Sequence, residues 1–390
     1  MKLVEGVHWV GVQDWNIKDF HGLHTPRGGS YNSYLILDDK IALIDVVNRE
    51  FFDELMANVS RIIDPEKIDY IVMNHAEPDH SGALPLVMKK AKNAKIIATK
   101  KGKDYLSKYH KALWEQRWEF IIVKEGDEIS LGKKTLKFVE VPMVHWPESM
   151  LTYLVQDRIL FTNDLLGTQI ADSRTFADEI EDFTDDAKDY FAYVIWPYPM
   201  LARNALKKLE SLPIGVIAPS HGPFWRYPQK IINLYKEWLD IPKKPKVVMA
   251  YATMWHSTER MANRIAEGIK DEGVQFKTFN LANVPMSRVL GEIVDAKALV
   301  LGSSTLTMGP LPLVSGFMRL LDMAKPKERI ATAFGAYGWG GGAVKKMMEG
   351  LKETGFELIE PGLEIQFEAD EEEITKCIEL GKRVAKAVKT

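Results

Sequence analysis

The sequence predicts an α/β protein of two domains, and three observations support this prediction. The chain has 390 residues, whereas one domain usually has about 100 to 200. Strand-like apolar runs alternate with amphipathic helical stretches in both halves. A Pro-Lys-Lys-Pro spacer separates the halves, where an amphipathic helix pattern gives way to a continuous apolar strand. We therefore expect one domain over residues 1–243 and a second over residues 246–390.

The first half reads as a mixture of hairpins and helices. Its strand-like runs span residues 33–46, 68–74, 94–100, 120–129, 134–143 and 150–162. The second half is more regular, because each strand is followed by a helix. Its expected strands span residues 247–253, 276–281, 296–304, 329–337 and 356–359. Regular alternation of this kind predicts a doubly wound parallel sheet of five strands.

The composition excludes several classes of protein. The chain is 46% hydrophobic and 27% charged, which is typical of a globular protein and excludes wholesale disorder. A net charge of -3 argues against a nucleic-acid partner, which would require a basic surface. No apolar run reaches the ~20 residues that a bilayer requires, and the start of the chain lacks an apolar export signal. We expect a cytoplasmic protein with no membrane association.

The single cysteine, Cys377, limits the choice of metal ligands. One thiol cannot form an intramolecular disulfide, nor can it hold an iron-sulfur cluster or a zinc finger. It lies in a predicted amphipathic terminal helix, where we interpret it as a structural residue. Any metal must therefore bind to His, Asp and Glu side chains.

Four potential metal ligands follow the strand predicted at 68–74. They are His75, Glu77, Asp79 and His80. On a helix, residues 75 and 79 would share a face but residue 77 would not, whereas a loop at a strand end can turn all four toward one point. The alternative is a polar capping turn in which Asp79 or Ser81 is an N-cap.

Three further candidates, His145, Asp164 and His221, also follow strand-like runs of the first half. A lone histidine at such a place is usually a hydrogen-bonded core residue. Several imidazoles and carboxylates brought by different strand ends to one edge are better explained by a bound cation.

The pattern H-x-E-x-D-H, followed by His, Asp and His, resembles the metallo-beta-lactamase fold, an αββα sandwich. Many members carry a histidine where this chain has Glu77, and a hard oxygen donor favours iron over zinc. This substitution is characteristic of the flavodiiron proteins. The resemblance implies that His75, Glu77 and His145 hold one iron, and that Asp164 bridges it to a second. Asp79, His80 and His221 would hold that second iron, although His80 does not coordinate in some members and is then a hydrogen-bond donor.

Three strand ends in the second half predict a flavin site. The first loop opens a helix with hydroxyl groups, as a phosphate site does, although an ordinary Ser-Thr N-cap has the same pattern. The other two offer small residues for close approach to a flat ring, with Trp255, Tyr337 and Trp339 as stacking surfaces. This order resembles a flavodoxin, whose ligand is FMN. The candidate contacts are Thr253, Met254, Trp255, His256, Ser257, Thr258, Ser303, Ser304, Thr305, Leu306, Thr307, Phe334, Gly335, Ala336, Tyr337, Gly338, Trp339, Gly340 and Gly341.

The resemblance to flavodiiron proteins covers nearly the whole chain and implies an oxidoreductase. Such an enzyme reduces dioxygen to water, nitric oxide to nitrous oxide, or both, at two non-haem irons. Electrons pass through FMN from rubredoxin, a flavoprotein reductase or reduced deazaflavin. The family also implies His21 and Tyr190 as proton donors, and a head-to-tail homodimer or a dimer of dimers. Two alternatives are a zinc hydrolase with a flavodoxin-like accessory domain and a flavodoxin-like electron shuttle with a vestigial metal domain.

Overall fold

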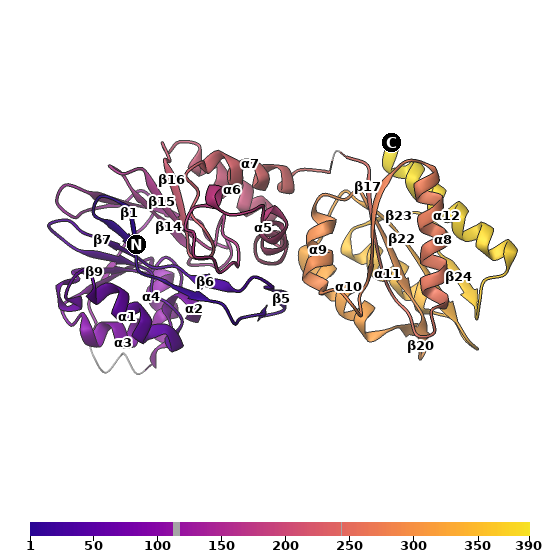
Figure 1. The fold of residues 1–390 in the computed structure, drawn as a ribbon, viewed down its shortest axis with the longest axis horizontal. Helices are drawn as coiled ribbons and strands as arrows, with labels where there is room; N and C mark the ends of the chain where they lie inside the picture. The colour runs from indigo at the N-terminus through magenta and orange to yellow at the C-terminus, as the bar shows by residue number, and fades with distance from the viewer. Residues whose placement is uncertain (112–117, 243) are drawn as a thin grey trace. The chain divides into compact units, whose positions relative to one another are not determined.

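The computed structural model describes residues 1–111, 118–242 and 244–390. The described chain divides into two compact units, Met1–Lys236 and Glu237–Thr390 (Figure 1). Residue 243, at which we expect the first domain to end, lies outside the described residues. Each unit is described by itself.

The first unit contains two β-sheets. The larger sheet has the order β1 (Lys2–Val4), β2 (Val7–Trp9), β7 (Tyr34–Ile36), β8 (Ala42–Ile44), β9 (Tyr70–Val72), β10 (Lys95–Ala98) and β11 (Phe120–Ile122). The smaller sheet has the order β12 (Glu128–Ser130), β13 (Thr135–Glu140), β14 (Met150–Leu154), β15 (Ile159–Asn163) and β16 (Val216–Pro219). Strands β8, β9 and β10 are parallel, and so are β15 and β16.

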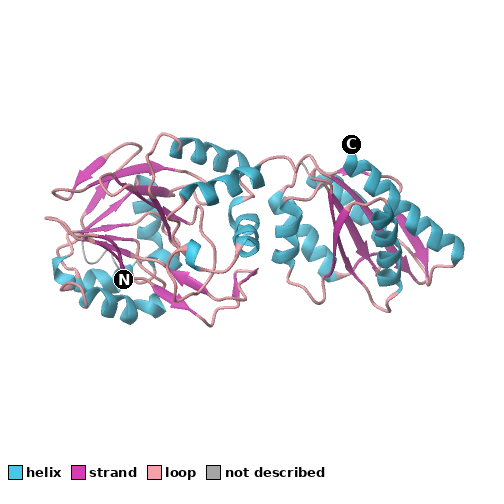
Figure 2. Cartoon of the chain, turned by 45° about the horizontal axis from the view of Figure 1, so that its top comes forward, coloured by secondary structure: helices cyan, strands magenta, loops and turns pink. Residues whose placement is uncertain are grey.

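Alternating side chains place this unit's core between its layers. In β8 and β9, Ile44 and Val72 face the smaller sheet and join its Phe138 and Phe161 in one buried cluster. Residues of the opposite parity pack against α1 (Phe52–Ser60) and α3 (Leu84–Lys90) in a second cluster. This alternation follows from the two-residue period of a strand. Helices α6 (Pro199–Leu209) and α7 (Pro228–Leu239) lie beside the smaller sheet (Figures 1 and 2). The predicted αββα sandwich is confirmed.

The remaining helices of the first unit are short. They are η1 (Arg49–Phe51), η2 (Pro65–Lys67), α2 (Pro78–Ser81), α4 (Lys100–Tyr109), η4 (Ala177–Glu179), α5 (Thr184–Tyr190) and the π-helical turn η5 (Phe191–Ile195). Among the described residues, no helix has the length and apolar character needed to cross a bilayer.

The second unit is the predicted doubly wound parallel sheet. Its strands have the order β18 (Gln275–Asn280), β17 (Lys246–Ala252), β19 (Ala298–Ser303), β22 (Ile330–Tyr337) and β23 (Glu357–Leu358), with β24 (Leu363–Gln366) also paired to β22. Its helices are α8 (Ser257–Asp271), α9 (Met286–Val294), α10 (Pro312–Ala324), α11 (Ala343–Thr354) and α12 (Glu371–Lys389). Figure 2 shows helices on both sides of these strands. Cys377 is buried where α12 meets the sheet, and burial raises the pKa of its thiol to about 11.

The structure contains strands that the sequence pattern did not predict. The last strand of the second sheet is split, because Pro361 lacks the N–H group needed to continue the ladder from β23 into β24. Several short strands precede residue 33. Besides β1 and β2, these are β3 (Val12–Asp14), β4 (Asp19–Phe20), β5 (Leu23–His24) and β6 (Gly29–Tyr31). A further hairpin, β20 (Thr305–Leu306) with β21 (Gly309–Pro310), follows β19.

Candidate functional site

The seven candidate metal ligands lie in four connections at the ends of strands. The segment after β9 carries the H-x-E-x-D-H motif, and the loop between β13 and β14 carries His145. Asp164 directly follows β15, and His221 follows β16. Most of these side chains are buried, so the site lies below the surface of the first unit.

The motif itself combines a loop with one helical turn. His75 and Glu77 lie in the loop, as expected, whereas Asp79 and His80 lie in α2, which begins at Pro78. The residue at the N-cap position is Glu77, and no side chain caps the helix. The alternative of a capping turn based on Asp79 therefore does not describe this segment.

The ligands form two groups that share Asp164. In the first, the Glu77 Oε2 atom lies 3.1 Å from His75 Nε2 and 3.2 Å from His145 Nε2. In the second, Asp79 Oδ2 lies 3.2 Å from His80 Nε2 and 3.1 Å from His221 Nε2. The two oxygens of Asp164 divide between the groups, with Oδ2 lying 3.2 Å from His145 Nε2 and Oδ1 lying 3.0 Å from His80 Nε2.

These distances fit metal coordination. Donor atoms bound at about 2.0 to 2.2 Å from one ion lie roughly 3 Å from each other. Three buried atoms at the same point, Asp79 Oδ1, His80 Nε2 and Asp164 Oδ2, make no hydrogen bond of suitable geometry among the described residues, although His80 Nε2 and Asp164 Oδ2 each lie within ion-pair distance of another ligand. Buried polar atoms are rarely left unpaired. Two cations joined by Asp164 would satisfy them.

The electrostatics of the two groups are strongly coupled. Burial lowers the pKa of His145 and His221, but hydrogen bonds to Asp164 outweigh this effect and raise these pKa values to about 9 and about 10. The pKa of His75 is also raised, because its carboxylate partners outweigh burial. Burial raises the pKa of Glu77 and Asp164, but the neighbouring imidazoles reverse this and hold both below their usual range. Protons on His75, His145 and His221 thus balance the carboxylates, and a bound cation would displace them.

A buried carboxylate that the sequence did not single out, Asp45, aligns the strand ends. Its oxygens accept hydrogen bonds from the Asn74 backbone at 2.8 Å, the Asn74 side chain at 2.9 Å and the Asn163 side chain at 3.3 Å. The Asn163 side chain also donates to Ser220 Oγ at 3.1 Å. Each of these three partners directly precedes a candidate ligand. The available signal was the position of Asp45 at the end of the run 33–46.

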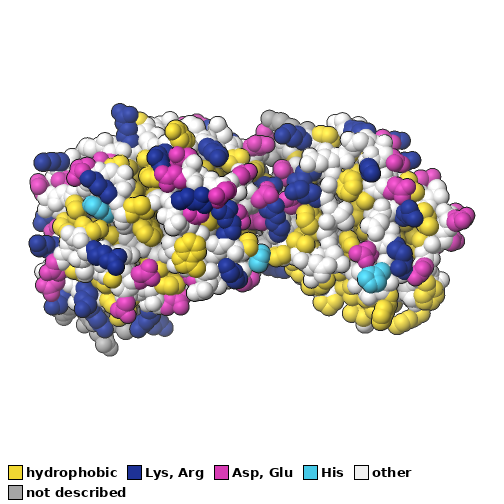
Figure 3. Space-filling model, in the orientation of Figure 1, with side chains coloured by type: hydrophobic (Ala, Val, Ile, Leu, Met, Phe, Trp, Pro, Cys, Tyr) yellow, Lys and Arg dark blue, Asp and Glu magenta, His cyan; other side chains and the backbone are white. Residues whose placement is uncertain are grey.

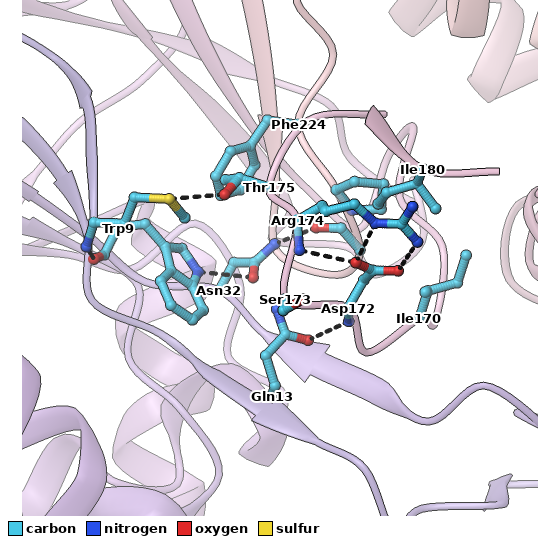
Figure 4. Close-up of a pocket in the computed structure, with 13 residues that line it drawn as sticks. Trp9, Gln13, Asn32, Ile170, Asp172, Ser173, Arg174, Thr175, Ile180 and Phe224 are labelled. Atoms are coloured by element: carbon cyan, nitrogen blue, oxygen red, sulfur yellow. Dashed lines mark hydrogen bonds and ion pairs between the residues drawn. The ribbon is translucent and has the colours of Figure 1, made fainter. Parts of the chain in front are cut away.

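A second buried amide holds the turn that carries His221. The Asn32 side chain donates to the carbonyls of Pro219 and Gly222, both at 2.8 Å. Its own oxygen accepts from Trp9 Nε1 at 3.0 Å. Figure 4 shows Trp9 and Asn32 in the wall of a small cavity of about 100 Å³ beside this turn. The cavity is too small for a large ligand, so we assign these residues a supporting role.

The two predicted proton donors differ in position. The buried Tyr190 hydroxyl donates to the Asp164 carbonyl at 3.1 Å and lies 3.4 Å from Asp164 Oδ1. Burial raises the pKa of Tyr190 well above its usual range, so its phenol stays neutral. His21 is exposed, and its ring packs on Phe20 at 4.6 Å, which in turn lies 5.9 Å from the His221 ring. The structure therefore brings Tyr190 to the ligands, whereas His21 lies one ring further away.

The second unit contains a cavity of about 530 Å³ at the carboxyl ends of β17, β19 and β22. This volume is within the range of small-molecule sites, about 300 to 1,000 Å³. Twelve of the predicted contacts line it: Met254, Trp255, Ser257, Ser304, Thr305, Leu306, Thr307, Ala336, Tyr337, Gly338, Trp339 and Gly340. Met308 and Phe367 also line the cavity, and neither was predicted. Met308 directly follows the predicted run 303–307, whereas Phe367 comes from the segment after β24.

The other predicted contacts lie outside the cavity lining. They are Thr253, His256, Thr258, Ser303, Phe334, Gly335 and Gly341. Phe334 is fully buried in the core, and the exposed His256 pairs with Glu259 at 2.6 Å. Thr258 Oγ1 lies 2.9 Å from the hydroxyl of Ser304, which does line the cavity.

The chemistry of this cavity fits a flat ring with an anionic tail. Two buried hydroxyls, Thr253 Oγ1 in the expected phosphate loop and Thr305 Oγ1 in the first of the two expected ring loops, have no hydrogen-bond partner among the described residues. The N-terminus of α8, which favours an anion, begins at Ser257. Trp255 and Trp339 are 80% and 97% exposed, so both indoles are free to cover a ring. Figure 3 shows hydrophobic side chains gathered on this end of the second unit, near β20.

Comparisons with known proteins identify the family of each unit. Residues 30–222 match the family described as ODP family beta lactamase, and residues 249–381 match the flavodoxin family. A nitric oxide reductase of Moorella thermoacetica is 42% identical over 98% of this chain and 97% of its own length.

Two solved structures have the same fold along the whole chain. The rubredoxin oxygen:oxidoreductase of Desulfovibrio gigas has a TM-score of 0.96 and 34% identity, covering 100% of this chain and 98% of that one. The flavodiiron protein of Giardia intestinalis has a TM-score of 0.95 and 31% identity, covering 99% of this chain and 96% of that one. A lactamase-like unit with two groups of ligands, joined to a flavodoxin-like unit, thus places this chain in the flavodiiron protein family, whose members are oxidoreductases.

Proposed function

We propose that this protein reduces dioxygen to water, nitric oxide to nitrous oxide, or both, at a pair of non-haem irons supplied with electrons by FMN. The main support for this proposal is the position of Asp164, whose two carboxylate oxygens face different ligand groups. Each group has two histidines and one carboxylate of its own. A site for two ions in the same chain as a flavodoxin-like unit is suited to storing several electrons. A hydrolase would need the metals alone.

The ligand set favours iron. His75, Glu77 and His145 would hold one ion, Asp79, His80 and His221 the other, and Asp164 both. All donors are nitrogen or oxygen, and Glu77 adds a hard oxygen where a zinc hydrolase of this fold would use imidazole. When bound, two irons and one FMN supply roughly four electrons, the number required to reduce dioxygen fully to water.

The residues around the site would hold the ions and deliver protons. Tyr190 is neutral and hydrogen-bonded to Asp164, so its hydroxyl is the nearest proton donor among the two predicted ones. Buried Asp45 and Asn32 fix the strand ends that carry the ligands. His21 belongs to the β4–β5 hairpin and would act only through an intervening group.

The names of similar proteins indicate the classes of substrate and electron donor to be compared. One similar protein bears the name nitric oxide reductase and another the name rubredoxin oxygen:oxidoreductase. Both gases therefore belong to the proposal. Rubredoxin, a flavoprotein reductase and reduced deazaflavin are the donor classes that we propose to compare.

We further propose a head-to-tail homodimer in which the flavin of one chain meets the irons of its partner. The mouth of the cavity in the second unit supports this proposal, because it exposes several large apolar side chains. Trp339, Trp255, Phe367 and Met308 are between 57% and 97% exposed. Exposed apolar patches of this kind commonly mark protein interfaces.

The first test is cofactor content together with activity. Protein reconstituted anaerobically with Fe(II) and FMN should hold about two irons and about one FMN per chain, and should consume dioxygen or nitric oxide with an artificial donor. His221→Ala should keep the flavin and the iron of the His75 site, but lose the second iron and at least about tenfold of the gas consumption. His8→Ala, on β2, is the matched control and should change neither quantity. Zinc without flavin would indicate the hydrolase, and flavin without metal the electron shuttle.

Iron affinity should rise with pH. Without metal, His145 and His221 hold protons up to pKa values of about 9 and about 10, whereas metal ligation needs neutral imidazole. Each displaced proton makes the apparent binding constant rise about tenfold per pH unit below those pKa values, and affinity is lost as the pH falls. The same raised pKa values also affect the free energy of unfolding of the metal-free protein. Their stabilising contribution is complete below about pH 6.5 and is lost as the pH rises through about 9 to 10. Calorimetry in buffers of different ionisation enthalpy measures the released protons, and an affinity that does not change from about pH 6 to about pH 8 would contradict this mechanism.

If the dimer is head-to-tail, two inactive variants should restore activity when they are mixed. His221→Ala disables the metal site, and Thr253→Asp places a negative charge where the FMN phosphate would bind, so each variant alone should be inactive. Random mixing of refolded chains makes half of the dimers hybrid, each with one complete flavin-metal pair. The mixture should therefore recover about a quarter of wild-type activity. Hybrid dimers that form but remain inactive would show that electrons pass within one chain.

A further inference from the structure

The two proposed ion sites have matched ligands. Each has two imidazoles and one carboxylate of its own, and each receives one oxygen of Asp164. On ligand composition alone, the two sites should bind iron equally well. A difference between them can arise from the groups that hydrogen-bond to the ligand side chains.

Those groups differ in the described structure. His75 Nδ1, the ring nitrogen that faces away from the metal, donates to Glu148 Oε1 at 2.7 Å. The corresponding nitrogen of His221, in the second site, donates to the backbone carbonyl of Ser30 at 2.6 Å. One site is thus supported by a carboxylate and the other by a neutral peptide oxygen.

The fold holds Glu148 rigidly in this position. Its Oε1 atom also accepts the backbone N–H of Ala76 at 3.1 Å, and its carbonyl accepts from Thr99 Oγ1 at 3.2 Å. The side chain is 3% exposed, and its second oxygen has no hydrogen-bond partner among the described residues. Glu148 also lies three residues after His145, so one loop joins both imidazoles of the first site.

We propose that Glu148 is a positioning residue that makes the His75 site bind its iron more tightly than the His221 site. Glu148 accepts a hydrogen bond from the His75 Nδ1–H group. This bond fixes the tautomer in which His75 Nε2 carries no proton and is free for the metal. A carboxylate acceptor also makes the imidazole a stronger donor than a peptide carbonyl does. The two ions therefore bind in a defined order, first at His75, Glu77 and His145. This inference rests on the proposed two-iron site and adds an inequality between its halves.

The test measures each site separately in the full-length chain. His221→Ala leaves the first site complete, and His145→Ala leaves the second site complete. Glu148→Gln is then added to each background, because glutamine keeps an oxygen acceptor of similar size and removes the charge. The dissociation constant for Fe(II) is measured anaerobically on metal-free protein by competition with a chelator. We expect Glu148→Gln to weaken binding about 10- to 100-fold in the His221→Ala background and less than about twofold in the His145→Ala background.

Two controls keep this result interpretable. Glu140→Gln makes the same chemical change on β13, where no described hydrogen bond joins the side chain to a ligand, and should not alter Fe(II) affinity. Circular dichroism of each metal-free variant reports whether it is folded. If Glu148→Gln does not fold, Glu148→Asp replaces it, because the shorter side chain lengthens the hydrogen bond to His75 and should weaken the first site alone.

The outcomes separate this inference from the proposed function. Equal weakening in both backgrounds, or none in the His221→Ala background, would overturn the role of Glu148 while leaving the two-iron site intact. Failure of the wild-type protein to bind any Fe(II) would overturn both.

Discussion

The structure depends on one electrostatic constraint, the burial of several carboxylates and imidazoles around Asp164. Burying charged groups is costly unless opposite charges compensate for them, and here each oxygen of Asp164 faces a separate set of imidazoles. Protons on His75, His145 and His221 supply part of that compensation, and three buried atoms of the site still make no hydrogen bond of suitable geometry among the described residues. Two divalent cations would satisfy the whole arrangement, and this requirement explains why so many polar strand ends meet in one place.

The fold meets the constraint by aligning strand ends rather than by a single motif. Asp45 accepts hydrogen bonds from Asn74 and Asn163, and Asn163 in turn donates to Ser220, so this chain of bonds links the residues before His75, Asp164 and His221 on three strands from two sheets. The second unit follows the same principle, since its cavity opens at the carboxyl ends of three parallel strands. Electron storage and gas chemistry, in the function that we propose, are thus assigned to two separate sheet edges of one chain.

Much of this could be predicted from the sequence, because ligand-type residues at strand ends and a regular strand-helix alternation are local signals. Residues that act through tertiary contacts gave no such signal. Asp45 and Glu148 resemble ordinary polar residues until the fold places them behind the candidate ligands, and Phe367 reaches the cavity of the second unit from a distant segment. Tyr190 and His21 were equivalent candidates in sequence, and only the fold distinguishes them. The strands before residue 33 have two or three residues each, too few for a periodic pattern to be recognised.

The central claim is a pair of irons bound by nitrogen and oxygen donors and joined by Asp164. Iron X-ray absorption spectroscopy of the anaerobically reconstituted protein tests it most directly. Each iron should have nitrogen or oxygen neighbours at about 2.0 to 2.2 Å and a second iron about 3.5 to 4 Å away. A spectrum without the iron-iron distance, or one that contains sulfur neighbours at about 2.3 Å, would contradict it.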